Sequence, residues 1–363
     1  MKRSILGLTA ATLALGAGMA QAEEVHVYNW SDYIDESLLE KFEAETGIDL
    51  VYDVFDSNEL LETKMLAGGS GYDVVVPTGT FLQRQIMAGA FQPLDKSKLP
   101  NIENLWDVIQ DRTDVYDPGG DYSINYMWGT TGIGVNVDKV AEVLGEDVAQ
   151  NSLSLIFDPA NAEKLAECGI YMLDAPTETV PAALTYAGWD NPDDKSEEAL
   201  AKAEEVLSAI SPYITKFHSS EYINALANGD ICVAFGWSGD VLIARDRAAE
   251  ADNGVNVEYY IPSEGALMWF DQMAIPVDAP NPDAAHKFLN FIMDAQNMAA
   301  ASNYVYYANG NKASQDFLNE DVIGDGAIYP DEATLDNLYT VTPFGPKEQR
   351  LLTRLWTRVK SGT

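Results

Sequence analysis

The sequence predicts an α/β protein made of two lobes with a ligand cleft between them. Short apolar segments alternate with amphipathic helical segments from residue 25 onward, which is typical of a mostly parallel sheet with helices on both faces. At 363 residues the chain is also long enough to build two substantial cores. Because no long linker or repeat separates the two halves, we expect several short crossings between the lobes.

The first lobe begins with a β-α-β-α-β series. The expected elements are a strand over 25–30, a helix over 34–46, a strand over 50–55, a helix that stops at 68–69 and a buried strand over 72–76. Gly47 marks the end of the first helix, and Ser57 or Asn58 is suited to cap the second. The polar segments 30–32, 56–58 and 78–80 follow the three strands, so we expect them along one edge of the sheet.

A second α/β region is expected to begin near 127–135, where three glycines interrupt an apolar stretch and suggest a hinge. Further elements are a strand over 170–173, a helix over 196–210, a strand over 231–235 and an alternating segment over 267–275. The expected lobes are 23–130 plus about 250–300, and 131–249 plus about 301–363.

The first 22 residues have the pattern of a secretory signal peptide. A basic start at Lys2 and Arg3 precedes an apolar stretch, and Ala20-Gln21-Ala22 fits a cleavage site. We therefore expect an exported protein without a membrane span. Removal of the signal peptide changes the formal charge from −35 to −37. A protein with this much negative charge is not expected to bind nucleic acid or an anionic membrane.

Cys168 and Cys232 are the only cysteines. In an exported chain an even pair indicates a disulfide, and the rival interpretation is one catalytic thiol beside an unrelated cysteine. The three histidines, at 26, 218 and 286, show no metal-binding spacing, so no metal site or cofactor is expected.

Three segments place an aromatic residue close to an acidic one at a predicted strand end or turn. The pairs are Trp30 with Asp32, Trp237 with Asp240, and Trp269 with Asp271. An indole face attracts an organic cation and packs its methylenes, and a carboxylate accepts hydrogen bonds from an ammonium group. The alternatives are an aromatic cluster that caps the core, and acid–base catalysis by paired carboxylates as in glycosidases.

Longer blocks carry a resemblance to a known family. They are VYNWSDYI at 27–34, VYDVFDSN at 51–58, FQPLDKSKLP at 91–100, TTGIG at 130–134, LDAP at 173–176, FHSS at 217–220, LANGDIC at 226–232 and WT at 356–357. Over residues 24–363 the chain resembles the periplasmic polyamine-binding proteins of bacterial ABC transporters. The resemblance implies a type II periplasmic-binding-protein fold, a monomer in the periplasm, a disulfide between the two cysteines, and delivery of putrescine or spermidine to an ABC permease.

The resemblance also implies roles for individual residues. Trp30 and Trp237 would flank the methylene chain, Asp240 and Asp271 would bind one ammonium, and Glu178 would bind the other. The remaining ligand-binding residues would be Ser31, Asp32, Tyr33, Thr78, Ser219, Trp269 and Tyr307, with Arg247 in a structural ion pair near Asp240.

The ligand's length is less determined. Putrescine-binding members of the family have a serine at the position of Thr78, and the extra methyl group of Thr78 narrows the pocket. The indole of Trp269 is similar to the residue of spermidine-preferring members at that position. We therefore favour spermidine over putrescine as the ligand. The alternatives are another small organic cation, an amino acid, or a thiaminase-like enzyme that uses a free cysteine on the same scaffold.

Overall fold

A computed structural model describes residues 23–362, so the expected signal peptide lies outside the described residues. The strands are β1 (Glu24–Trp30), β2 (Asp49–Phe55), β3 (Val74–Val75), β4 (Ser123–Asn136), β5 (Ile170–Met172), β6 (Lys216–Phe217), β7 (Val233–Trp237), β8 (Val257–Tyr260), β9 (Ala266–Ala274), β10 (Ala308–Asn309) and β11 (Leu338–Tyr339). The α-helices are α1 (Glu36–Thr46), α2 (Asn58–Ala67), α3 (Gly79–Met87), α4 (Asp107–Thr113), α5 (Val137–Leu144), α6 (Ser154–Phe157), α7 (Pro159–Leu165), α8 (Pro176–Tyr186), α9 (Glu197–Ile210), α10 (Glu221–Ala227), α11 (Ser238–Ala251), α12 (Pro282–Ile292), α13 (Ala295–Val305), α14 (Glu320–Ile323), α15 (Glu332–Asp336) and α16 (Pro346–Ser361). Among the described residues, no helix is both long and apolar enough to cross a membrane.

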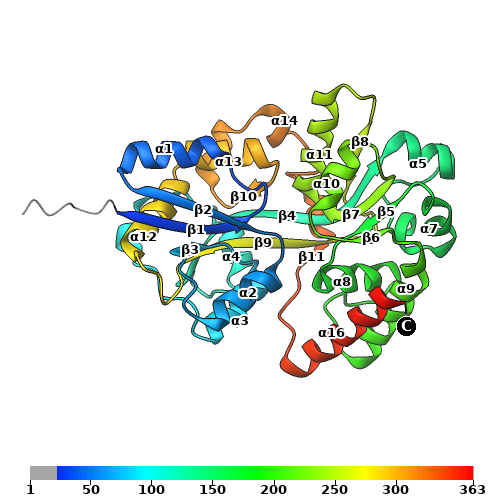
Figure 1. Ribbon diagram of the computed structural model, residues 1–363, viewed down its shortest axis with the longest axis horizontal. Coiled ribbons are helices and arrows are strands. Elements are labelled where there is room, and N and C mark those ends of the chain that lie inside the picture. The colour runs from blue at the N-terminus through cyan, green and yellow to red at the C-terminus, as the bar shows by residue number, and fades with distance from the viewer. Residues whose placement is uncertain (1–22, 363) are drawn as a thin grey trace, which may run out of the picture.

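The strands form one mixed sheet that runs through both lobes, in the order β2-β1-β3-β9-β4-β7-β5-β6. Strands within each end of the sheet are parallel, as the α/β alternation predicts. The long strands β4 and β9 pair antiparallel to each other in the middle. In Figure 1 these two strands cross from the lobe with β1, β2 and α1 to the lobe with α5, α7 and α9.

The buried apolar residues form two clusters, one in each lobe. The first cluster joins β1, β3, α1, α12 and α13 through residues such as Val25, Phe42, Val74, Phe288 and Met298. The second joins β5, β7, α9, α11 and α16 through residues such as Ile170, Leu207, Val233, Val241 and Leu355. Each lobe therefore has its own core, and the expected two-lobed α/β fold is confirmed.

Helix capping explains the boundaries of the first helices. The Asp35 carboxylate accepts a hydrogen bond from the Ser37 N–H, so α1 begins at Glu36, two residues later than predicted. Gly47 ends it with a left-handed φ of 69°, and Ser57 caps α2 as predicted. Trp30 is the last residue of β1, and Asp56 and Thr78 lie in the loops that follow β2 and β3.

The segment near 127–135 differs from the prediction. It belongs to a 14-residue strand, β4, that begins at Ser123 and is buried throughout. Its glycines do not interrupt the strand. They lie where side chains pack closely on its backbone, aromatic at Gly129 and Gly132 and aliphatic at Gly134. A Cβ added at Gly129 would lie 2.7 Å from the Trp269 ring.

Cys168 and Cys232 form a disulfide, with their Cα atoms 5.4 Å apart. The bond joins the segments that lead into the adjacent parallel strands β5 and β7. Because it uses both cysteines of the sequence, neither is a free thiol.

Replacing both cysteines with alanine is expected to lower the free energy of unfolding by about 4 kcal/mol, because the bond closes a loop with a sequence separation of 64 residues. Urea unfolding followed by tryptophan fluorescence measures this difference, and the wild type in reductant is the matched control. A loss below about 1 kcal/mol would contradict the expectation.

Candidate ligand-binding site

A narrow cavity lies between the two lobes. Its lining residues are Trp30, Ser31, Tyr33, Phe55, Asp56, Thr78, Glu178, Ser219, Ser220, Ile223, Trp237, Asp240, Trp269, Asp271 and Tyr307. The volume of the cavity is about 40 Å³. A slot of this size fits a slim, unbranched molecule.

Asp271 lies on β9 on the first lobe's side of the cavity. Its carboxylate accepts hydrogen bonds from the Thr78 hydroxyl, at 2.7 Å, and from the Tyr33 hydroxyl, at 2.8 Å. The residue is only 4% exposed. Burial raises the pKa of Asp271 to about 7, the two hydroxyls lower it, and the charge of Asp240 raises it further.

Asp240 lies in the first turn of α11. Two tyrosine hydroxyls donate to its carboxylate, that of Tyr222 at 2.7 Å and that of Tyr307 at 2.8 Å. Desolvation raises the pKa of Asp240 to about 6, and these two hydrogen bonds oppose the shift. The side chain is therefore held in place by neutral donors.

Glu178 lies in the first turn of α8 and is 8% exposed. The Trp237 indole N–H donates to one carboxylate oxygen at 3.0 Å, and the Thr131 hydroxyl donates to the other. Burial raises the pKa of Glu178 to about 7, and these hydrogen bonds lower it. One side chain, Trp237, thus both lines the cavity and orients a carboxylate.

Aromatic rings form the walls between the carboxylates. Trp30 and Trp237 meet edge to face with their ring centroids 5.7 Å apart, and Trp269 and Tyr307 meet at 5.2 Å. Tyr307 reaches this position because Gly239 has no side chain; a Cβ there would lie 2.4 Å from the tyrosine ring.

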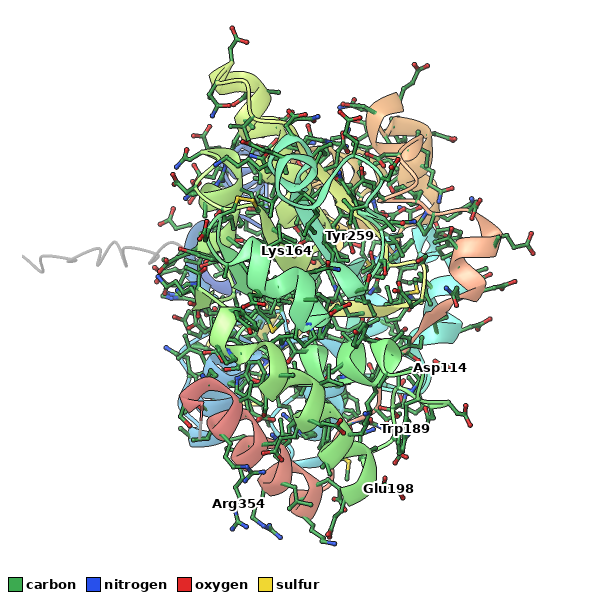
Figure 2. All side chains as sticks on the ribbon, turned by 90° about the vertical axis from the view of Figure 1, so that its right-hand side faces the viewer. Asp114, Lys164, Trp189, Glu198, Tyr259 and Arg354 are labelled. Atoms are coloured by element: carbon green, nitrogen blue, oxygen red, sulfur yellow. A yellow bond between two sulfur atoms is a disulfide. The ribbon has the colours of Figure 1, made fainter. Side chains whose placement is uncertain are left out.

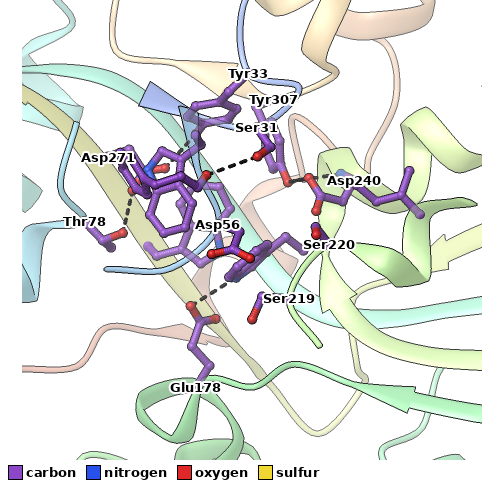
Figure 3. Close-up of a pocket in the computed structure, with 15 residues that line it drawn as sticks. Ser31, Tyr33, Asp56, Thr78, Glu178, Ser219, Ser220, Asp240, Asp271 and Tyr307 are labelled. Atoms are coloured by element: carbon purple, nitrogen blue, oxygen red, sulfur yellow. Dashed lines mark hydrogen bonds between the residues drawn. The ribbon is translucent and has the colours of Figure 1, made fainter. Parts of the chain in front are cut away.

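The cavity therefore combines negative charge with apolar walls. Figure 3 shows Asp271, Asp240 and Glu178 approaching it from three different sides. None of the described residues that line it is Lys, Arg or His. Carboxylates that are buried without a cation are costly, and a ligand with positive charges at separate points would remove that cost.

The family model that describes bacterial extracellular solute-binding proteins matches residues 37–329 of this chain. The chain belongs to this family.

Two relatives of this solute-binding protein align over nearly their whole length. The putrescine-binding periplasmic protein SpuD of Pseudomonas aeruginosa is 52% identical over 100% of both chains. The putrescine-binding periplasmic protein PotF of Escherichia coli is 49% identical over 99% of this chain and 98% of its own. A solved structure, a putative spermidine/putrescine ABC transporter from Listeria monocytogenes, has a TM-score of 0.82 at 32% identity and covers 93% of this chain and 99% of its own.

The structure brings together nearly all of the predicted site residues of this solute-binding protein. The exception is Asp32, which has a left-handed φ of 53° and does not line the cavity. Its carboxylate pairs instead with the Arg247 guanidinium at 2.8 Å. The Arg247 charge also lowers the pKa of Asp240, so both residues act at the edge of the site.

Four lining residues were not predicted: Phe55, Asp56, Ser220 and Ile223. Phe55 and Asp56 end the second strand, and their position at a strand tip was the available signal. Ile223 lies on α10, and nothing in its local sequence distinguishes it from a core residue.

Proposed function

We propose that this solute-binding protein captures a short aliphatic polyamine in the periplasm and delivers it to the permease of an ABC transporter. The observation that carries the proposal is the narrow aromatic cavity in which Glu178 and Asp271 are buried and Asp240 is partly buried, without a cationic partner. A ligand with an ammonium group at each end supplies those missing charges. The names of the relatives at 52% and 49% identity support the same class of ligand.

In this proposal Trp30 and Trp237 pack against the methylene chain. Asp271 and Asp240 hold one ammonium group, and Glu178 holds the other. The charge of Asp240 raises the pKa of Asp271, which is expected of two carboxylates that share one cation site. Ser31, Tyr33, Thr78, Ser219, Trp269 and Tyr307 complete the wall, and Asp32 acts from the edge of the site.

For the length of the ligand we propose putrescine. The two relatives named above are putrescine-binding proteins, whereas those named for spermidine and putrescine together, such as that of Escherichia coli, are 31% identical. The small volume of the cavity also favours the shorter amine. The indole of Trp269 remains the argument for spermidine, and calorimetric titration with both amines decides between putrescine and spermidine.

Capture requires the two lobes to close over the ligand. We propose lobes of 23–130 plus about 250–300, and 131–249 plus about 301–363. The two apolar clusters support this division for most of the chain, but Ile109 and Tyr259 pack in the second cluster, and Val305 and Val341 pack in the first. The closed state, which buries the ion pairs, would be the form that the permease recognises.

We further propose that the protein is a monomer and acts by binding alone, without a cofactor. An amino acid would need a positive group for its carboxylate, and the described lining residues supply none. The thiaminase-like alternative needed a free thiol, and both cysteines are in the disulfide.

Calorimetric titration tests the proposal. The chain from residue 23 is unfolded, dialysed and refolded to remove any ligand that co-purifies, and is then titrated with putrescine, spermidine and a panel of amino acids. We expect binding with a Kd of about 1 μM or tighter for putrescine, which corresponds to about −8 kcal/mol, and weaker binding of spermidine. Tighter binding of spermidine would overturn the length assignment, and binding of an amino acid alone would overturn the polyamine class.

A further inference from the structure

The C-terminal helix α16 carries positive charge on an otherwise strongly acidic protein. The chain has 57 acidic and 22 basic residues. Five of the basic residues lie on α16, which contains only one acidic residue: Lys347, Arg350, Arg354, Arg358 and Lys360, with Glu348. This helix is therefore a local exception to the charge of the whole molecule.

Three of these basic residues are neutralised within the second lobe. Lys347 pairs with Glu197, Arg358 with Glu204 and Lys360 with Asp174. Arg350 and Arg354 are exposed, and neither forms an ion pair with any residue that the structure describes.

The two arginines point away from the core. They are four residues apart, so they share one face of the helix, opposite the buried Leu352, Leu355 and Val359. Figure 2 shows Arg354 projecting from α16 into solvent at the lower edge of the molecule. Guanidinium groups presented in this way match carboxylates with paired hydrogen bonds.

A groove lies beside Arg354. It runs between α9 and α16, has a volume of about 230 Å³, and is lined by Leu200, Ala201, Leu351 and Leu355 together with Glu197, Glu204, Arg354 and Arg358. An apolar floor with a charged rim is the usual composition of a protein–protein contact surface. Arg354 belongs to both the groove and the exposed positive face.

The same helix touches the other lobe. The Arg84 guanidinium of α3, held by Glu62 at 2.9 and 3.0 Å, donates to the Gln349 side-chain oxygen at 3.2 Å. Gln349 directly precedes Arg350. This contact joins α3 of the first proposed lobe to α16 of the second.

We propose that Arg350, Arg354 and the α9–α16 groove form a docking surface for an acidic periplasmic face of the membrane permease. This inference rests on the proposed function, which supplies the permease as partner. Charge complementarity favours an acidic partner, because the exposed Arg350 and Arg354 attract such a face whereas the protein as a whole is strongly acidic. The Arg84–Gln349 contact lies next to this patch and bridges the two proposed lobes, so a movement of the lobes would alter it.

The test compares Arg350→Glu/Arg354→Glu with wild type in nanodiscs of zwitterionic lipid that contain the cognate permease and its ATPase. We expect the concentration of putrescine-loaded protein at half-maximal ATPase stimulation to rise about tenfold, with the maximal rate retained. The difference is expected to shrink in 0.5 M salt, because salt screens exposed charges.

The single variant Arg354→Glu is measured beside the double variant, and Lys164→Glu is its matched control, because each of these two single changes alters the net charge by the same amount. Lys164, labelled in Figure 2, is exposed on α7 and forms no ion pair with a described residue. The Lys164→Glu variant is expected to give half-maximal ATPase stimulation at the wild-type concentration. Calorimetry is expected to give every variant the wild-type affinity for putrescine.

Unchanged half-maximal stimulation by the double variant, with putrescine binding intact, would overturn the docking surface and leave the proposed function standing. A difference that appears only in nanodiscs with anionic lipid would overturn it in favour of a lipid contact. Failure of the wild type to bind any polyamine would instead remove the proposed function itself.

Discussion

Asp271→Asn is expected to weaken putrescine binding by about a hundredfold or more, because it removes the more deeply buried of the two carboxylates that hold one ammonium group. The same change is expected to make the ligand-free protein more stable at pH 8. The two effects have one cause, since Asp271 is a buried carboxylate that is 4% exposed and receives only the neutral hydroxyls of Thr78 and Tyr33.

The stability effect depends on pH. Burial raises the pKa of Asp271 to about 7 in the folded protein, against about 3.9 in an unfolded chain. A carboxyl group with a raised folded-state pKa contributes stability that is fully present below the unfolded pKa and is lost as the pH rises through about 7. At pH 8 the ionised group costs about 4 kcal/mol, because each unit of pKa difference corresponds to about 1.4 kcal/mol, and asparagine avoids this cost. We expect a net gain of about 1 to 2 kcal/mol, because the amide matches the two hydroxyls less well.

Calorimetry measures the affinity, and urea unfolding of the ligand-free protein at pH 8 and pH 5 measures the stability. The gain is expected to vanish at pH 5, where Asp271 is largely protonated. Asp56→Asn is the matched control, because Asp56 lines the same cavity but is exposed, and both effects should be smaller. Binding within about threefold of wild type would mean that Asp271 does not hold an ammonium group.

The sequence predicts the parts of this fold that depend on local pattern. Helix caps such as Ser57 and the alternation of apolar segments are local, and the structure places the loops after β1, β2 and β3 together at the cavity as predicted. The course of β4 is not local. Its glycines resemble an interruption, yet Gly129 is needed because the Trp269 ring, from a distant strand, packs on the backbone.

The same distinction applies to the site. Aromatic and acidic residues at strand ends could be selected from the sequence, because their chemistry and position agree. The side chains that donate hydrogen bonds to these carboxylates could not be predicted from the sequence. Tyr222, which donates to Asp240, is fully buried on α10 and carries no sequence signal of a site. The left-handed backbone of Asp32, which directs it to Arg247, also depends on tertiary packing.

Lowering the pH from 8 to 5.5 is expected to weaken putrescine binding by about a hundredfold or more. In the ligand-free protein the pKa values are about 7 for Glu178 and Asp271 and about 6 for Asp240, each raised mainly by burial. The ammonium groups of the ligand stay charged throughout, because the pKa of an alkyl amine lies near 10. Protons and the ligand therefore compete for the same carboxylates, and the protons prevail as the pH falls.

Competition of this kind releases protons. At pH 7 Glu178 and Asp271 are each about half protonated in the free protein, so binding is expected to release about one proton per ligand. Titrations in phosphate and in Tris measure this number, because the apparent enthalpy changes with the ionisation enthalpy of the buffer. Asp271→Asn is expected to lower the number of protons and to flatten the pH profile.

Histidine is the other side chain that changes charge in this pH range, and His218 lines the neighbouring cavity beside Ser219. His218→Gln is therefore the control, and it is expected to keep the wild-type pH profile. Loss of the pH dependence in this variant would assign the effect to the imidazole and not to the carboxylates. An affinity that stays within about threefold from pH 5.5 to 8, with equal enthalpies in both buffers, would mean that putrescine does not rely on these carboxylates for its charge partners.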